Sequence, residues 1–384
     1  MKITDNISYV GVEDLDLDLF ESQYVVPEGV TYNSYIIMDE KITIMDTVDK
    51  RRTDKWLENV EKALDGKEPT YLVVSHLEPD HSANIENLAN KYPNMKIVLS
   101  KKALDMLPQF CDEKLIERSI AVAEGEELNI GSTSLKFFMA PMVHWPEVMV
   151  TYDAKDKVLF SADGFGKFGA TLDTDDWACE ARRYYFNICG KYGMQVQMLL
   201  KKAATLDIQI ICPLHGPILK ENLEYYINKY DIWSKYEPED KGTVIFYNSI
   251  HGNTRNLVET LEKIMKEEGK EAASVFDLAR CDMAEAIEDA FRYDKMIIAS
   301  PTYDAGLFPD TENFLRHLAH KGFCNRKVAI IENGSWAPMS GKLMRDIFAT
   351  MKNVEVIEKV VTIKTRMNEN TPNELRELVL ELTK

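Results

Sequence analysis

The segment 71–89, YLVVSHLEPDHSANIENLA, holds four potential metal-binding side chains within six positions. His76, Glu78, Asp80 and His81 directly follow an apolar run that is typical of a β-strand. Two imidazoles and two carboxylates crowded into one loop are costly unless a cation neutralises the acids. The spacing therefore predicts a metal site in this loop.

Three more such side chains occupy the same kind of position further along the chain. His144 in APMVHWPE, Asp163 in LFSADGFG and His215 in CPLHGP each stand where an apolar strand gives way to a loop with Gly or Pro. Loops held by a rigid scaffold are where sites are usually built. Each histidine alone is more simply an ordinary loop histidine. Four of the chain's 7 histidines in such positions, beside three acids, favour a shared metal site.

A second candidate site lies at residues 249–254, which read Ser-Ile-His-Gly-Asn-Thr between a strand-like run and a helical one. Hydroxyl groups and backbone N–H groups at a helix N-terminus can surround a phosphate. The loop has no Lys after its glycine and no G-x-G-x-x-G, so it is neither a nucleoside-triphosphate loop nor a dinucleotide loop.

Two later turns, 300–309 and 333–341, combine small residues with an aromatic side chain, Tyr303 or Trp336, that can flank a planar ring. Either turn alone is as consistent with an ordinary surface loop, but three such turns on three successive strands favour a ligand site. The residues expected to bind this ligand are Ser249, Ile250, His251, Gly252, Asn253, Thr254, Pro301, Thr302, Tyr303, Asp304, Ala305, Asn333, Gly334, Ser335, Trp336 and Gly341.

The candidate site residues lie in two regions of the chain that differ in their order of strands and helices. Up to about residue 235, short strands dominate, with a predicted hairpin at 31–48 and a predicted helix at 54–66, which indicates an α+β domain of αββα type. The polar segment 234–242, SKYEPEDKG, predicts a linker. Beyond it, strands and helices alternate five times, which predicts an α/β doubly wound parallel sheet. We therefore expect domains at 1–238 and 239–384.

Charge and composition narrow the class of partner. The formal net charge of −17 argues against nucleic-acid and anionic-membrane binding. No apolar run has the length of a membrane helix or of a signal-peptide core, and the 6 cysteines are scattered without a C-x-x-C pair. These features predict a cytoplasmic protein with reduced thiols.

The second half resembles the flavodoxins, whose phosphate loop has the form hydroxyl-x-hydroxyl-Gly-x-Thr. Ser249, Gly252 and Thr254 match that form, while His251 replaces the middle hydroxyl and still offers a hydrogen bond to a phosphate. The resemblance implies bound FMN.

The first half resembles the metallo-β-lactamase superfamily, whose first motif is H-x-H-x-D-H. Glu78 stands where the second His would be, and this exchange makes the set harder and more anionic, which favours iron over zinc. Joined to a flavodoxin-like half, it resembles the flavodiiron proteins, or A-type flavoproteins. The resemblance implies one iron on His76, Glu78 and His144, a second on Asp80, His81 and His215, and Asp163 as the bridge. His81, which some members lack, is present.

The resemblance also implies an activity. Two ferrous ions and a reduced flavin supply four electrons, enough to reduce O2 to water, and two suffice to couple two NO into N2O; both gases stay open as substrates. It further implies a head-to-tail homodimer, or a dimer of such dimers, an external electron donor (a rubredoxin or a reduced deazaflavin), and Tyr192 as a hydrogen-bond donor near the metals. The alternative is a dizinc hydrolase with a flavodoxin-like docking module.

Overall fold

The computed structural model describes all 384 residues, and these form two compact units. Unit 1 comprises Met1–Tyr185 and Met194–Asp231, and unit 2 comprises Phe186–Gly193 and Ile232–Lys384. The boundary expected between residues 238 and 239 lies in the short segment that joins α7 (Leu223–Ser234) to β16 (Asp240–Tyr247). The inclusion of residues 186–193 in unit 2 was not expected from the sequence.

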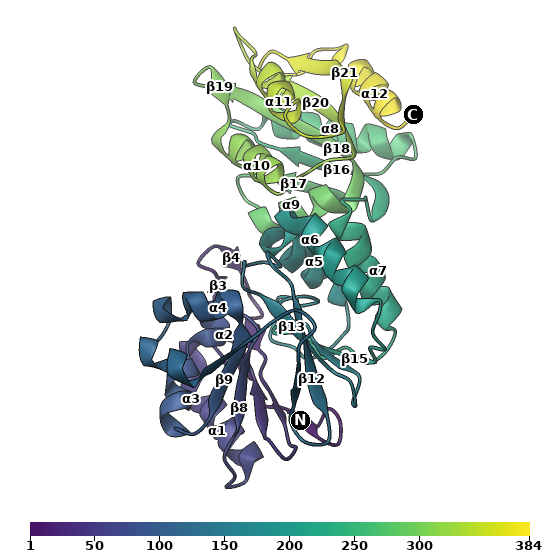
Figure 1. Cartoon of the computed structure of the whole chain (residues 1–384). Helices are drawn as coiled ribbons and strands as arrows, with labels where there is room; N and C mark the ends of the chain where they lie inside the picture. Colours follow the sequence, from purple (N-terminus) through teal and green to yellow (C-terminus); the bar gives the residue numbers. More distant parts are fainter. The chain divides into compact units, whose positions relative to one another are not determined.

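Unit 1 contains two larger sheets and two small hairpin-like pairs (Figure 1). The first sheet has the order β1-β6-β7-β8-β9-β10, and the second has the order β11-β12-β13-β14-β15. The strands of the first sheet are β1 (Ile7–Tyr9), β6 (Tyr35–Ile37), β7 (Thr43–Met45), β8 (Tyr71–Val74), β9 (Lys96–Ser100) and β10 (Ser119–Val122). The strands of the second are β11 (Glu127–Asn129), β12 (Ser134–Met139), β13 (Met149–Asp153), β14 (Val158–Phe160) and β15 (Ile210–Cys212). The small pairs are β2 (Val12–Asp14) with β5 (Val30–Tyr32) and β3 (Leu19–Phe20) with β4 (Tyr24–Val25).

The hydrophobic core of unit 1 lies between its two sheets. Alternate residues of the first sheet, such as Val73 and Val98, cluster with Phe137, Met149 and Phe160 of the second. This is what period-two alternation produces when two sheets pack face to face. Helices cover the outside, with α1 (Thr53–Leu64), α3 (Ile85–Lys91) and α4 (Lys101–Met106) beside the first sheet (Figure 1). The αββα prediction is confirmed, including the antiparallel β6–β7 hairpin.

Unit 2 is a parallel sheet of order β17-β16-β18-β20-β21 with helices on both faces. Leu257 of α8 and Leu378 of α12 pack with Ile245 of β16 on one face. The neighbouring side chain Phe246 points the other way and contacts Phe314 of α10, with ring centroids 4.5 Å apart. The prediction of a doubly wound sheet is confirmed. The elements not yet given are β17 (Ser274–Asp277), β18 (Tyr293–Tyr303), β19 (Gly306–Leu307), β20 (Arg326–Asn333), β21 (Val354–Ile363), α8 (Asn253–Glu267), α9 (Met283–Arg292), α10 (Pro309–His320), α11 (Ser340–Phe348) and α12 (Thr371–Leu382).

The loops at the carboxyl ends of the strands carry the candidate residues in both units. In unit 1 these are the loops after β8, β12, β14 and β15, and in unit 2 the loops after β16, β18 and β20. No helix of the structure combines the length and apolar character needed to cross a membrane.

Candidate metal centre and flavin site

Loops from both sheets of unit 1 bring the seven predicted metal-binding residues together. His76 and Glu78 follow β8, and Asp80 and His81 lie in the short helix α2 (Pro79–Ser82). This compact turn is favoured by the proline at its first position and places Asp80 and His81 next to each other. The remaining three arrive on the loops after β12, β14 and β15, far away in sequence.

The first group consists of His76, Glu78 and His144. The Nε2 atoms of His76 and His144 lie 3.2 Å and 3.0 Å from Oε2 of Glu78. The ligand atoms of all three converge within 4.8 Å of one another. They form one three-donor cluster.

The second group consists of Asp80, His81 and His215. Oδ2 of Asp80 lies 3.2 Å from Nε2 of His81 and 3.3 Å from Nε2 of His215. The two imidazole Nε2 atoms are themselves 3.0 Å apart. Six donor atoms are thus arranged in two adjacent sets of three.

Asp163 lies between the two groups, with one carboxylate oxygen facing each. Its Oδ2 is 3.5 Å from His76 Nε2 and 3.7 Å from His144 Nε2. Its Oδ1 is 3.5 Å from His81 Nε2 and 3.7 Å from His215 Nε2. This is the geometry of a carboxylate that can bridge two cations.

The distances between these atoms fit two metal ions. Two donors bonded to one metal at about 2.1 Å and separated by about 90–110° lie roughly 3.0–3.4 Å from each other. The donors are also left without other partners, since both carboxylate oxygens of Asp80 and Oδ2 of Asp163 are buried and make no hydrogen bond. Buried carboxylates of this kind require cations. The donor set fits iron, because three carboxylates accompany four imidazoles.

The pKa values of His76 and Asp163 also indicate that the carboxylates of this site need nearby positive charge. Burial acts to lower the pKa of His76, but hydrogen bonds to Glu147 and Glu78 and the charge of Asp163 raise that pKa to about 10. Burial acts to raise the pKa of Asp163, yet the hydrogen bond from His81 and the charges of the neighbouring histidines lower it. Without metal ions, protons supply the cations that these acids need.

Residues behind the donors orient the imidazole rings, and they were not predicted from the sequence. Glu147 Oε1 lies 2.8 Å from Nδ1 of His76, and the backbone carbonyl of Thr31 lies 2.7 Å from Nδ1 of His215. Such partners fix which ring nitrogen is free for a metal. An acid three residues after His144 is the sequence signal that points to Glu147.

A tyrosine of unit 1, Tyr184, reaches the metal group. The hydroxyl of Tyr184 donates to Oδ1 of Asp163 at 3.1 Å. Tyr192 ends a 3-10 turn, Gly190–Tyr192, that belongs to unit 2. The role expected for Tyr192 therefore stays a prediction, and unit 1 supplies a tyrosine of its own.

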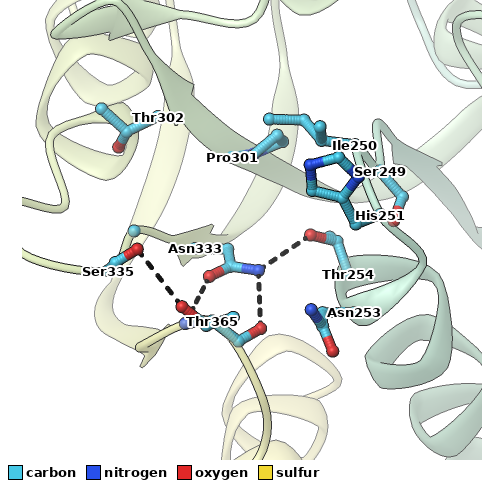
Figure 2. Close-up of a pocket in the computed structure, with 11 residues that line it drawn as sticks. Ser249, Ile250, His251, Asn253, Thr254, Pro301, Thr302, Asn333, Ser335 and Thr365 are labelled. Carbon is cyan, nitrogen blue, oxygen red and sulfur yellow. Dashed lines mark hydrogen bonds between the residues drawn. The ribbon is translucent and has the colours of Figure 1, made fainter.

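The predicted flavin loops of unit 2 enclose a pocket (Figure 2). Its lining consists of Ser249, Ile250, His251, Asn253, Thr254, Pro301, Thr302, Asn333, Gly334, Ser335 and Thr365. Ser249 Oγ accepts the N–H groups of Gly252 at 3.1 Å and of Arg255 at 3.2 Å, which bends the chain into the start of α8. Gly252 has φ +90°, a value that favours glycine. The loop therefore presents the N-terminus of a 15-residue helix to the pocket.

Asn333 ties the opposite walls of the pocket together, as Figure 2 shows. Its Nδ2 donates to Thr254 Oγ1 at 3.2 Å and to the carbonyl of Thr365 at 3.1 Å, and its Oδ1 accepts the N–H of Thr365 at 2.9 Å. Thr365 was not expected in the site. It lies after β21, and no turn signature marks it in the sequence.

The aromatic side chains expected to flank a ring do not line the pocket. Trp336 is 92% exposed and Tyr303 is 46% exposed, and Tyr303 contacts Phe308 edge to face. Asp304 and Ala305, both with positive φ, form the turn before β19. Gly341 lies against Glu332, which accepts its N–H at 2.8 Å. Ligand contacts from these residues stay predictions.

Each half of the chain matches a known protein family model. Residues 30–216 match a family model described as ODP family beta lactamase, and residues 244–355 match a flavodoxin domain model. An anaerobic nitric oxide reductase flavorubredoxin of Vibrio vulnificus is 28% identical over 382 residues, covering 95% of this chain and 75% of that protein.

Solved structures show the same two-domain organisation. Rubredoxin oxygen:oxidoreductase of Desulfovibrio gigas superposes with a TM-score of 0.91 at 26% identity, covering 100% of this chain and 97% of that one. The flavodiiron protein of Giardia intestinalis superposes with a TM-score of 0.91 at 25% identity, covering 99% and 95%. The chain belongs to the flavodiiron protein family.

Proposed function

We propose that this protein reduces O2 to water, NO to N2O, or both, at two iron ions bound by unit 1, with electrons that arrive through FMN bound by unit 2. One iron would be bound by His76, Glu78 and His144 and the other by Asp80, His81 and His215. The main support for the proposal is the position of Asp163, because each of its two carboxylate oxygens faces a different one of the two groups. A shared carboxylate places two metals close enough for one diatomic molecule or a pair of them.

The cofactors supply electrons, two from a ferrous pair and two from a reduced flavin. Four electrons and four protons convert O2 into two waters, and two electrons and two protons convert two NO into N2O and one water. The protein's own residues do the positioning. Glu78, Asp80 and Asp163 supply negative charge that stabilises oxidised iron, and Glu147 and Thr31 orient His76 and His215.

The external donor and the assembly are part of the same proposal. A rubredoxin or a reduced deazaflavin would reduce the flavin, and a head-to-tail homodimer, or a dimer of dimers, would bring the FMN of one chain to the metals of its partner. The exposed apolar side chains around the flavin pocket, Ile250, Tyr303, Trp336 and Met339, are available for such a contact. We place the protein in the cytoplasm, where its 6 cysteines stay reduced. An active strict monomer in sedimentation velocity would contradict the dimer.

Rapid mixing of the fully reduced protein with each gas tests the activity. The protein, loaded with iron and FMN, is reduced anaerobically and mixed separately with O2 and NO while flavin absorbance is followed. The proposal expects fast reoxidation by at least one gas, with water or N2O as product and no released peroxide. Failure to reoxidise with either gas would overturn it.

Metal analysis separates this function from the second candidate, a dizinc hydrolase with a flavodoxin-like docking module. The match of residues 30–216 to a β-lactamase-type model is the observation that favours the hydrolase. Iron with stoichiometric FMN in protein purified from its native host supports the redox function. Two zinc ions without flavin support the hydrolase.

A further inference from the structure

Glu147 joins the two segments that carry the donors of the first metal group. It follows His144 by three residues in the loop after β12, and its side chain is buried. Its Oε1 accepts the N–H of Leu77 at 3.0 Å in addition to its contact with Nδ1 of His76. Its own carbonyl accepts the hydroxyl of Ser100 at 2.7 Å. The carboxylate is therefore fixed through Oε1 to the loop after β8, and its second oxygen, Oε2, is buried and without a partner.

No acid is hydrogen-bonded to Nδ1 of either imidazole in the second metal group, and the buried carboxylate of Asp46, whose charge acts on both His81 and His76, is hydrogen-bonded to Ser75 instead. Nδ1 of His215 faces the neutral carbonyl of Thr31 at 2.7 Å, and Nδ1 of His81 is buried without a hydrogen-bond partner. A carboxylate behind a ligating imidazole makes the ring a stronger electron donor than a neutral carbonyl does. The two metal positions thus have similar donors but different hydrogen-bond partners at the Nδ1 atoms of their imidazoles.

We infer that Glu147 is a positioning residue that makes the two metal positions unequal. It holds His76 in the tautomer whose Nε2 faces the metals, and its charge strengthens metal binding and favours the more oxidised state at the position formed by His76, Glu78 and His144. The claim that Glu147 strengthens metal binding depends only on the geometry of unit 1. The claim that it favours the more oxidised state rests on the proposed diiron function.

The test compares two variants of the full-length protein loaded with iron and FMN. Glu147→Gln removes the charge at constant size and keeps an acceptor for Leu77. Ser100→Ala is the matched control, because it loosens the same loop by removing the bond to the Glu147 carbonyl while leaving the charge behind His76. The measurements are metal release to a chelator and the midpoint potentials of the two irons, followed by electron paramagnetic resonance during a redox titration.

Glu147→Gln is expected to weaken retention of one of the two metals by about 10–100-fold and to leave the other unchanged. The ferric-to-ferrous ratio at that iron should fall about tenfold at fixed potential, equivalent to an upward shift of about 59 mV for a one-electron couple. Ser100→Ala should change neither quantity. Wild-type behaviour of Glu147→Gln, or equal weakening at both positions, would overturn the inference.

A third variant and a second metal complete the test. Glu147→Asp keeps the charge on a shorter side chain and should restore part of the lost retention; an equal loss in both variants contradicts the role of charge. If Glu147→Gln does not fold, loss confined to one metal in Glu147→Asp is the supporting result, and wild-type retention is the opposing one. Repeating the metal-release assay with Co²⁺ in place of iron distinguishes failure of this inference from failure of the proposed gas reduction. The Co²⁺ assay measures metal binding alone, so its result is valid even if the wild-type protein reduces neither gas.

Discussion

The two sites of this protein are built in opposite ways. The metal centre of unit 1 is built from side chains, with His76, His81 and Asp163 almost fully buried and the carboxylate oxygens of Asp163 3.5 Å from Nε2 of His76 and of His81. The flavin pocket of unit 2 lies at the start of α8 and is lined mostly by short polar side chains and backbone groups from several loops, and the predicted aromatic residues lie exposed. A charge removed from the first site has no water to replace it, whereas the second can exchange lost contacts for solvent. Substitutions should therefore cost far more in unit 1.

Asp163→Asn should give the largest effect, because this one side chain faces both metal groups. We expect loss of both metals together and loss of gas reduction, and in the metal-free protein a destabilisation of about 3–5 kcal/mol from unpaired buried imidazolium charge. Metal analysis and chemical unfolding measure these effects. The exposed Asp175→Asn is the control. Retention of one metal at wild-type affinity would show that the two groups are independent.

Metal removal should make the stability of unit 1 fall as the pH rises. In the metal-free protein the pKa of His76 is raised from 6.5 to about 10, so its protonation stabilises the fold fully below about pH 6.5. That contribution is lost as the pH rises towards 10, while metal-bound imidazole is already unprotonated. Melting temperatures of metal-free and metal-loaded protein between pH 6.5 and 10 check this. Parallel pH curves for the two forms would contradict it.

Ser249→Ala tests the flavin pocket and should have a moderate effect. Its hydroxyl accepts two N–H groups at the start of α8, an interaction comparable to a helix cap worth about 0.5–2 kcal/mol. The dissociation constant of FMN should rise about 2- to 30-fold, with metal content unchanged. Flavin fluorescence titration measures this, with Thr260→Ala on the exposed side of α8 as the control. Unchanged affinity would mean that the loop holds its shape without this hydroxyl.

Trp336→Ala should have the smallest effect. The side chain is 92% exposed, so the free energy of unfolding should change by no more than about 0.5 kcal/mol. If the indole packs on the flavin ring, the FMN affinity should fall by about 0.5–1.5 kcal/mol. Unfolding of the flavin-free protein and fluorescence titration separate the two quantities. A large loss of stability without flavin would show that the indole has a structural partner instead.

Much of the molecule was predictable from local patterns. Period-two alternation predicted the hairpin at 31–48, which forms β6 and β7, and the βα alternation predicted the parallel sheet of unit 2. The segment 76–81 brings its donors together through local spacing alone, because a single loop and a short helix carry all four. The position of Ser249 before a helix similarly reveals the phosphate-type loop.

The parts that escaped prediction depend on packing between distant segments. Glu147 and His76 are 71 residues apart and meet only because β8 and the loop after β12 end at the same edge of the two sheets. Thr365 joins the flavin pocket through Asn333, 32 residues away, and Tyr184 reaches Asp163 from a separate helix.

The sequence by itself therefore determined the donor types, their order along the chain and the choice of a carboxylate at Glu78, since these are properties of residue identity and local spacing. Only the tertiary structure decided which oxygen of Asp163 faces which histidines and which acid supports His76. Those pairings arise when two sheets pack face to face, and a buried carboxylate then takes whichever partners that packing leaves within hydrogen-bonding distance.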